Sequence, residues 1–585
     1  MRLQTALADE LVPPTEVRED IPPARPTRGI RARRRVLPWV RSTIRVTRDR
    51  WRNWSGELES VPGRIYCDDT GGPWKSPRTL ADLQAIVRDA RSRGATIRAF
   101  GSSHSWASLV PNDGGFLVDN RMIGAVDGWY RPFVTPAPAD GSRKARATVP
   151  PGVLSGEFEE WLWEQGYTLP ASAVEDVFSM GGMAATATHG TGLATATISD
   201  MISAVTFVDG LGNVQRWSRE TSTPDELAAV QCGLGCLGLV FDLTFDVEPR
   251  YEVLHESRLV PYARLFADTP AARAALRELH ETHDSVEFFW WPLRFSGLPL
   301  VSRPEINPEV WVLTTRRSLP RGVPPRGPLR RFIHMQVLDM AAMMSTGPVM
   351  TLLQRRKYHA QVMAWITCFT NLWVDARSGA FRMPQYDANH FVNAGGVEFV
   401  RAMAAEWSVP FKRHADSEHP EGYERVRQSF AVLHDEIVAA FHRWPLSDDR
   451  AVPVTLALEM RTLRASTALM SAGYHPDAAS GEVYIAAPEL VTGAFHPAWP
   501  QFSELANRAM THQPHIFGPD VRSHLAKFAH ACSHPDYPVG GMPAFLRASY
   551  RRAGAWQRFQ RVRQCVDPDN IFLNPYLREW FLRDD

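Results

Sequence analysis

The chain has 585 residues, of which 44% are hydrophobic, 22% charged and 10% aromatic, a composition typical of a globular protein and not of a disordered or collagen-like one. Its 65 basic and 64 acidic side chains give a net charge of +1, so charge provides no general reason to expect a nucleic acid partner. The six cysteines are too few and too scattered for a disulfide scaffold, and they indicate reduced thiols in a cytoplasm-like compartment.

The first fifty residues differ in composition from the rest of the chain. Between Arg25 and Arg52 there are eleven arginines and one acid, Asp49, after a Pro-rich acidic start. We expect a solvated, disordered leader, with a polybasic arm that contacts anionic lipid as the alternative. The pattern RARRRVLPWV is similar to a twin-arginine signal, but no apolar region or cleavage site follows it, so we do not expect export.

No stretch reaches the roughly 18 uninterrupted apolar residues of a membrane-spanning helix. The chain is therefore not expected to be integral to a membrane. We expect a cytoplasmic protein, with membrane association through the basic leader as an open alternative.

Residues 51–250 alternate helical and strand patterns. The segment 76–94 predicts an amphipathic helix with Ser76 or Thr79 as its N-cap and Gly94 as its end, followed by the strand TIRAF. The helix-then-strand pattern returns over 152–170, and 201–217 predicts a hairpin with its turn at 210–213. We expect an α+β fold, with a larger second domain from about residue 251 in a sequence rich in Trp, Phe and Pro.

The glycines Gly233, Gly235 and Gly238 match the dinucleotide-binding motif GxGxxG. A helix-like segment precedes them and a β-rich segment follows, which reverses the strand-then-helix order that brings helix amides to a pyrophosphate. We therefore do not expect a nicotinamide site here. The sequence also has no G-x-S-x-G elbow and no Walker A loop, so it gives no support to a serine hydrolase of that type or a P-loop NTPase.

Two histidine groups could suggest a metal site. His280 and His283 lack the i,i+4 spacing of a zincin helix, and His530, Cys532 and His534 have no obvious further ligand. We expect ordinary polar residues at both places and no bound metal.

The segment AFGSSHSWASL, residues 99–109, is the first that carries chemistry. A strand that opens into a turn of Gly101, Ser102 and Ser103 leaves backbone amides free to converge on an anion, because small residues permit close approach. His104 lies inside this turn. From the residues alone it could be a structural hydrogen bonder, a base or a covalent anchor.

The second such segment is SMGGMAATATHGTGLATATISDMI, residues 179–202. Its many Gly, Ala and Thr residues predict a surface almost without large side chains, against which a flat ligand could lie. The alternative is a glycine-rich linker, but linkers seldom join two β-rich runs with so much Thr and Ala and so little charge.

Several motifs in order resemble those of a known superfamily. PRTLADLQAIVRDA, GSSHSW, SMGGMAATATHGTG and LGCLGLVFDLTFDVEP resemble the FAD-binding domain of the vanillyl-alcohol oxidase superfamily. NWSGELESVPGRIY, RSHLAK and VDPDNIFLNPYL are similar to the aldonolactone oxidase group within it. The resemblance covers about 51–250 and 450–585. It implies a two-part FAD-binding domain over 51–250, an α+β substrate or cap domain over 251–520, and a C-terminal segment, 521–585, that returns to the flavin.

The resemblance implies FAD as the cofactor and assigns the residues that hold it. His104 would be bonded covalently to a methyl of the flavin ring, as in the family. The residues implied for the diphosphate are Gly101, Ser102, Ser103 and Ser105, and those implied to line the cofactor are Gly181, Gly182, Thr188, His189 and Gly192.

The run VTLALEMRTLR predicts a strand on which Glu459 and Arg461 emerge on the same face. The alternative is a solvent-facing ion pair of little value. The resemblance implies that this pair binds substrate hydroxyls and that Arg461 keeps Glu459 ionised. It also implies that Lys527 stabilises the anionic reduced flavin and that His524 supports it. Leu525 departs from the Trp of the family, which leaves the shape of the cavity wall open.

The implied reaction is oxidation of a CH–OH group of an aldonolactone or polyol, with hydride transfer to the flavin, proton loss assisted by Glu459, and reoxidation by oxygen to give hydrogen peroxide. Ala187 stands where several family members have Gly, and a methyl there can obstruct oxygen. A dehydrogenase with a quinone or cytochrome acceptor is therefore an alternative. A region 251–450 rich in Trp, Met and Phe leaves open a bulkier alcohol such as a sterol. The non-enzyme alternative is a flavin-fold protein that docks to membranes.

Overall fold

The computed structural model describes residues 29–31, 45–297, 302–318, 364, 367–368, 378–392, 402–414, 422–528 and 533–583. Most of the predicted leader lies outside these residues, as do His530 and Cys532. Among the helices that are described, none is both long and apolar enough to cross a membrane.

The N-terminal region, residues 45–249, contains a small parallel sheet. Its strands pair in the order β5 (Arg64–Tyr66), β7 (Phe116–Asp119) and β6 (Ile97–Phe100), with α1 (Leu80–Ser92) between β5 and β6. The α1 helix begins at Thr79, whose hydroxyl accepts from the backbone of Asp82 while the Asp82 carboxylate accepts from Thr79. This confirms the predicted helix and selects Thr79 as its N-cap.

A second sheet of the N-terminal region is antiparallel and, among the described residues, has the order β13-β12-β14-β10-β9, with β11 paired to β14. Its strands are β9 (Phe133–Thr135), β10 (Ala145–Val149), β11 (Tyr167–Thr168), β12 (Ile202–Val208), β13 (Val214–Ser218) and β14 (Leu239–Pro249). Its helices are α2 (Ser155–Glu164), α3 (Met180–Ala185) and α4 (Pro224–Gln231). The β12–β13 pair confirms the predicted hairpin.

The central region, residues 252–528, is built on a large antiparallel sheet. In the described part of the chain its order is β20-β15-β19-β16-β22-β23-β21-β24. Its strands are β15 (Glu252–Pro261), β16 (Ser285–Trp290), β19 (Glu309–Ser318), β20 (Gly379–Pro384), β21 (Ala402–Lys412), β22 (Ala457–Arg464), β23 (Val483–Gly493) and β24 (Arg522–Ser523). Its helices are α5 (Tyr262–Phe266), α6 (Pro270–Thr282), α10 (Gln385–Asn389), α11 (Glu424–Arg443), α12 (Trp499–Thr511) and α13 (Pro514–Phe517).

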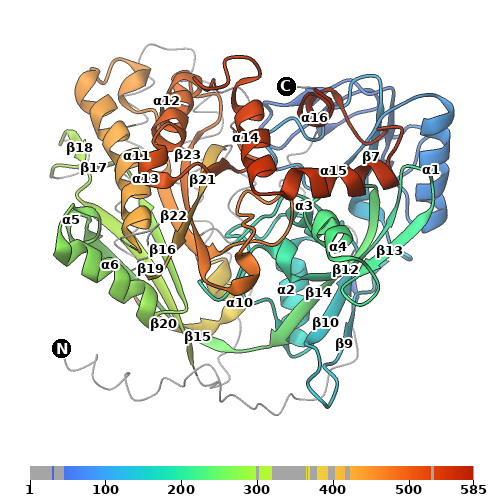
Figure 1. Ribbon diagram of the computed structural model, residues 1–585, viewed down its shortest axis with the longest axis horizontal. Helices are drawn as coiled ribbons and strands as arrows, with labels where there is room; N and C mark the ends of the chain where they lie inside the picture. Colours follow the sequence, from blue (N-terminus) through green and yellow to red (C-terminus); the bar gives the residue numbers. More distant parts are fainter. Residues whose placement is uncertain are drawn as a thin grey trace.

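The C-terminal helices return to the N-terminal region. They are α14 (Gly541–Arg552), α15 (Ala555–Val566) and α16 (Pro575–Phe581), drawn in red in Figure 1. Their apolar side chains, such as Tyr550 and Phe559, share one core with Phe158 and Phe245 of the N-terminal region. Further short strands are β1 (Ile30–Arg31), β2 (Arg45–Val46), β3 (Trp51–Arg52), β4 (Glu59–Ser60), β8 (Trp129–Tyr130), β17 (Leu293–Phe295) and β18 (Pro304–Ile306).

Candidate functional site

One large cavity, of about 470 Å³, lies between the N-terminal and central regions. Residues from the 101–105 turn, the small-residue segment 181–189, the strand β22 and the segment after β24 all line it. The predicted site residues that the structure brings together here are Gly101, Ser102, Ser103, His104, Ser105, Gly181, Gly182, Thr188, His189, Glu459, Arg461, His524 and Lys527.

The turn after β6 leaves its backbone amides unused. Within the described part of the chain, the N–H groups of residues 102–105 have no acceptor. Ser103 is in the left-handed region at φ 58°, and the Ser102 hydroxyl accepts from the backbone of Ser179 at 3.0 Å. A Cβ on Gly101 would lie 2.2 Å from the Ser179 hydroxyl, so this position accepts only glycine. Consecutive free amides in a concave turn suit a diphosphate.

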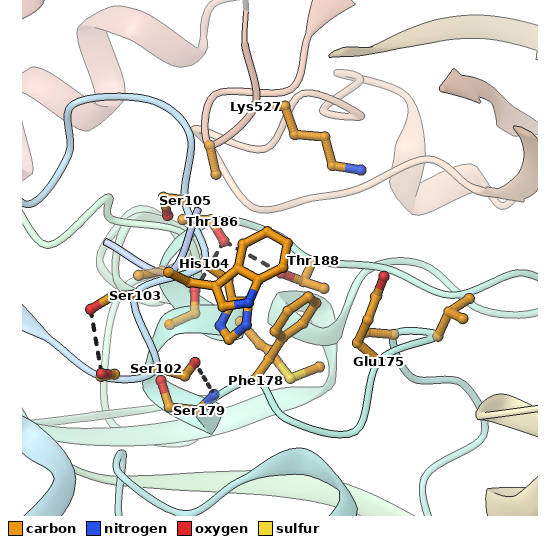
Figure 2. Close-up of a pocket in the computed structure, with 18 of the residues that line it drawn as sticks. Ser102, Ser103, His104, Ser105, Glu175, Phe178, Ser179, Thr186, Thr188 and Lys527 are labelled. Carbon is orange, nitrogen blue, oxygen red and sulfur yellow. Dashed lines mark hydrogen bonds between the residues drawn. The ribbon is translucent and has the colours of Figure 1, made fainter. Parts of the chain in front are cut away.

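His104 projects from this turn into the cavity, where Figure 2 shows it beside Phe178. Neither of its ring nitrogens has a hydrogen-bond partner among the described residues, although both are buried. Burial lowers the pKa of His104 to about 3, against a smaller opposing effect of the Ser102 backbone. The side chain is therefore a neutral imidazole with an unused lone pair. A covalent anchor for a flavin fits these properties.

The small-residue segment forms one wall. Thr186, Thr188 and Gly182 line the cavity along and after α3, and Figure 2 shows both threonines across from the 102–105 turn. Ala187, between them, has φ 54° and is buried in the core of the N-terminal region, and it is not among the cavity-lining residues. The wall without bulky side chains is the surface that the sequence predicted for a flat ligand.

Gly192 corrects one prediction. It was expected to line the cofactor, but it lies in the wall of a second, smaller cavity of about 170 Å³. The physical reason is a backbone bond: the Gly192 N–H donates to the carbonyl of Thr462 at 2.8 Å, with Gly192 at φ 123°. This bond turns the chain away from the main cavity and onto β22.

Glu459 and Arg461 stand side by side on β22, facing the cavity. The Arg461 guanidinium lies 2.9 Å from the Glu459 carboxylate, 3.4 Å from Glu489 on β23 and 3.7 Å from Glu287 on β16. The side chains are nearly buried, at 8% exposure for Arg461 and 16% for Glu459, so the pair is not the solvent-facing ion pair of the alternative interpretation.

Arg461 lowers the pKa of Glu459, in the predicted direction, but burial has the larger effect. Burial raises the pKa of Glu459 to about 8, reinforced by the charges of Glu489 and Glu175. Glu459 is therefore a carboxyl that exchanges its proton near neutral pH, as a general acid or base must.

Lys527 faces carboxylates on two strands. Its ammonium group lies 2.7 Å from Glu406 on β21 and also pairs with Glu489. The second Glu406 oxygen is 2.9 Å from the Nε2 of His189. Burial alone would raise the pKa of Glu406, but Lys527 and His189 hold it well below its ordinary value. The charge of Lys527, predicted to act on the flavin, is thus already compensated by two carboxylates.

His524 lies close to Lys527 and Glu406, and its imidazole is neutral. Its Nδ1 accepts from the backbone of Ala526 at 3.3 Å, and burial lowers its pKa to about 4. Leu525, between His524 and Ala526 in the sequence, is buried in the core of the N-terminal region and does not line the cavity. The Leu that stands here in place of the Trp of the family therefore forms no part of the cavity wall.

Three acidic residues that complete the cluster were not predicted from the sequence. Glu287, Glu406 and Glu489 each lie in an otherwise apolar strand, as in AMAAEWSV and IAAPELV. A lone carboxylate in an apolar β-run was the signal that could have found them, because a buried charge requires a partner.

Part of the cavity wall is apolar. It is formed by Phe289 on β16, Trp291 just after it, Phe391 after α10, Leu456 just before β22 and Val491 on β23. Ring pairs such as Phe289–Trp291, at 6.0 Å between centroids, keep this wall tightly packed. The guanidinium of Arg461 lies 5.5 Å from the centre of the Phe289 ring, so the apolar wall adjoins the charged cluster.

The glycine loop 233–238 follows α4 and precedes β14, which confirms the reversed order. The loop nevertheless lines the cavity, which the sequence analysis did not anticipate. The fully buried Arg98 donates to the carbonyls of Leu234 at 2.6 Å and Gly235 at 2.8 Å and so fixes the loop against β6.

The metal candidates take other roles. The Nδ1 atoms of His280 and His283 contact backbone carbonyls of their own helix at 2.8 and 2.9 Å. Within the described residues, three ligand-type groups come together at Cys67, Asp69 and Asp119, where Arg121 bridges the two carboxylates.

Comparison with known sequences identifies the N-terminal region. Residues 75–218 match the family described as FAD binding domain. A D-arabinono-1,4-lactone oxidase from Eremothecium gossypii is 26% identical over 215 residues, 37% of this chain and 37% of that protein. An L-gulono-1,4-lactone dehydrogenase from Mycobacterium tuberculosis is 29% identical over 245 residues, 41% of this chain and 49% of that protein. The matched segments span half or less of these curated relatives.

Comparison with solved structures covers nearly the whole chain. A structure titled solvent-stable cholesterol oxidase has a TM-score of 0.67 at 17% identity and covers 93% of this chain and 99% of its own. The cholesterol oxidase from B. sterolicum has a TM-score of 0.65 at 15% identity with the same coverage. The likeness establishes the fold. The chain therefore carries an FAD-binding domain whose sequence relatives are lactone oxidases and dehydrogenases, which confirms the predicted resemblance, the α+β fold class and FAD as the cofactor.

Proposed function

We propose that the protein is an FAD-dependent oxidoreductase that oxidises a CH–OH group of an aldonolactone or polyol. One observation carries this proposal: the free amides and imidazole of the 102–105 turn line the same cavity as Glu459, Arg461 and Lys527. A cofactor site and a group of proton-handling side chains thus share one enclosed space. The lactone oxidases and dehydrogenases among the relatives support the substrate class.

FAD, when bound, supplies the acceptor for the hydride of the carbinol carbon. The amides of residues 102–105 hold its diphosphate, and the segment 181–189 accommodates its flat ring beside His104. Glu459 receives the hydroxyl proton, since its pKa of about 8 matches the range in which a base must exchange protons. Arg461 orients Glu459 and the substrate oxygen, and Glu406 fixes Lys527 and His189 in place.

The experiment that tests this proposal is anaerobic mixing of the purified holoprotein with aldonolactones and polyols, with the flavin absorbance followed in time. Bleaching by one of these donors in wild type and its loss in Glu459→Gln supports the proposal. A flavin that no CH–OH donor reduces contradicts it and favours the non-enzyme alternative of a flavin-fold docking protein.

A second substrate class has its own support. The apolar wall of Phe289, Trp291, Phe391, Leu456 and Val491 suits a bulky alcohol such as a sterol better than a polyol. The same anaerobic assay, run with a sterol in detergent, separates the two classes. Faster bleaching by the sterol than by any lactone overturns the first assignment and keeps the reaction type.

We propose oxygen as the electron acceptor, with formation of hydrogen peroxide; a quinone or cytochrome is the alternative. Timed return of the flavin colour in aerated buffer distinguishes the two. Fast return supports an oxidase, whereas slow return that an added quinone or cytochrome accelerates favours a dehydrogenase. Ala187 is buried in the core and does not line the cavity, so its methyl gives no structural support to the second alternative.

Membrane contact through the basic leader is a further prediction, for residues that are mostly outside the described part of the chain. Flotation with anionic and neutral vesicles tests it. Binding only to anionic vesicles, and its loss when Arg33, Arg34 and Arg35 are changed to Gln, is the expected result.

A further inference from the structure

The imidazole of His104 is held between two aromatic rings. The indole of Trp54 stacks on it, with 5.0 Å between ring centroids and 28° between the planes. The ring of Phe178 lies on it at 4.9 Å and 57°. All three side chains line the main cavity, and Figure 2 shows Phe178 next to His104 within it. Ring contacts thus set the plane of this imidazole.

Two other buried histidines, His280 and His390, are oriented by hydrogen bonds. The Nδ1 of His280 contacts the carbonyl of Leu276 at 2.8 Å, and that of His390 contacts Val174 at 2.9 Å. His104 has no such bond in the described structure. Burying a polar ring without hydrogen bonds costs stability, so its retention points to a use for the free nitrogens.

Trp54 is itself attached to the turn that carries His104. The backbone N–H of Trp54 donates to the carbonyl of Ser103 at 3.1 Å, and the Asn53 side-chain amide donates to the carbonyl of Ser105 at 3.1 Å. The segment between β3 and β4 is therefore bonded to the turn on both sides of His104. Trp106 packs edge-on against the indole, at 6.1 Å and 78°. The backbone bonds and the ring contacts together place the indole against the imidazole.

We propose that Trp54 and Phe178 form an aromatic clamp that presents a neutral His104 nitrogen to the flavin ring methyl, with Trp54 as a positioning residue for covalent attachment. This inference rests on the proposed function, in which His104 is the anchor of FAD. Trp54 lies outside the matched residues 75–218, whereas His104 and Phe178 lie within them.

In covalent attachment, the His104 nitrogen takes the place of one hydrogen on the flavin methyl carbon. The His104 nitrogen loses its proton and joins the methyl carbon, which loses one hydrogen. The two electrons and two protons released pass to the flavin ring, and dioxygen then takes them up as hydrogen peroxide. A neutral imidazole is required, because a protonated ring has no lone pair to donate. Stacking on two rings in a buried site maintains that state and restricts the nitrogen to one approach.

The test follows covalent attachment over time. Apoprotein from a riboflavin-starved host is mixed with FAD, and acid-precipitated samples are separated by denaturing electrophoresis and viewed by flavin fluorescence. We expect Trp54→Leu to bind FAD but to form the bond about tenfold more slowly, since an aromatic contact is lost. Trp54→Phe, which keeps a stacked ring, should stay within about twofold of wild type.

Trp51→Leu is the matched control. Trp51 is buried three residues earlier and packs on Phe100 at 6.5 Å, but it does not line the cavity. We expect this variant to lose stability and to keep the wild-type rate of attachment.

Two outcomes overturn the clamp and are distinguishable. Attachment in Trp54→Leu at the wild-type rate refutes the clamp and leaves the proposed function intact. FAD that remains dissociable in wild type refutes both the anchor and the clamp. If circular dichroism shows that Trp54→Leu does not fold, Phe178→Leu and Trp54→Phe provide the comparison: a wild-type rate in Phe178→Leu then refutes the clamp, and a slower one supports it.

Discussion

The two sides of the cavity satisfy their polar groups in opposite ways. On the side of the N-terminal region, the amides of residues 102–105 and both nitrogens of His104 have no partners in the described structure. On the side of the central region, Arg461 and Lys527 are surrounded by carboxylates. The hydrogen-bonding groups of the first side are free to bind a ligand. The charged groups of the second side already pair with one another. This difference supports our proposal that the first side binds the cofactor and the second handles protons.

The largest effect that tests the separate roles of the two sides is expected from removal of one proton-handling group. Glu459→Gln keeps the shape of the side chain and abolishes its basicity, so we expect the rate of flavin reduction by substrate to fall by about 10²–10⁴-fold. Flavin content should be unchanged, because Glu459 is on β22 and makes no hydrogen bond to the turn that carries His104. The measurements are anaerobic stopped-flow absorbance and in-gel fluorescence. The exposed Glu482→Gln is the control, and equal rates in the two variants would contradict the assignment.

The ion pairs of the central side should dominate stability. Glu406→Gln removes the charge that both Lys527 and His189 contact, and we expect a loss of about 3 kcal/mol in the free energy of unfolding, as for other broken buried pairs. Urea denaturation followed by tryptophan fluorescence measures this loss. Glu504→Gln, in a partly exposed pair with Arg508, should cost less than about 1 kcal/mol. Similar losses of unfolding free energy in both variants would show that the buried ion pairs stabilise the protein no more than an exposed pair does.

The pH dependence of flavin reduction sharpens the role of Glu459. A base must be deprotonated to accept a proton, and burial raises the pKa of Glu459 to about 8. The reduction rate should therefore rise about tenfold per pH unit below pH 8 and level off above it. Stopped-flow reduction between pH 6 and 9.5 provides the profile. A rate that is flat across this range, or that falls as pH rises, excludes Glu459 as the base.

The smallest effect on stability is expected from a substitution in the 102–105 turn. Ser102→Ala removes the acceptor of the Ser179 N–H and should lower the free energy of unfolding of the apoprotein by only about 1 kcal/mol. The affinity for FAD should fall more clearly, because the turn loses a bond that shapes its free amides. Thermal unfolding and FAD titration of the apoprotein measure the two effects. A variant with lowered stability but unchanged FAD affinity would argue against this turn as the diphosphate site.

The sequence was informative where the signal is local. The cap of α1, the hairpin at 210–213 and the reversed order around the glycine loop all depend on neighbouring residues, and the structure agrees with each. The Glu459–Arg461 pair on one strand face is local in the same sense. The roles assigned to these site residues remain predictions.

Interactions across the large sheet were not predictable in this way. The pairing register places Glu489 opposite Glu459 and Glu287 opposite Arg461, over separations that no sequence pattern encodes. The raised pKa of Glu459, which comes chiefly from burial and also from Glu489, depends on this arrangement and could not be read from the strand alone. Gly192 failed for a related reason, since its bond to Thr462 belongs to a strand 270 residues away.

The return of the C-terminal helices has a consequence for biosynthesis. The Ile97 N–H donates to the carbonyl of Ile571, and Arg98 donates to that of Phe572 across 474 residues of sequence, so the strand leading to the 101–105 turn is anchored by a segment that is translated much later. During synthesis this strand lacks both contacts until residues 571 and 572 have been added. We therefore expect the turn to take its final shape, and to bind a flavin, only after the helices that return to it have been made.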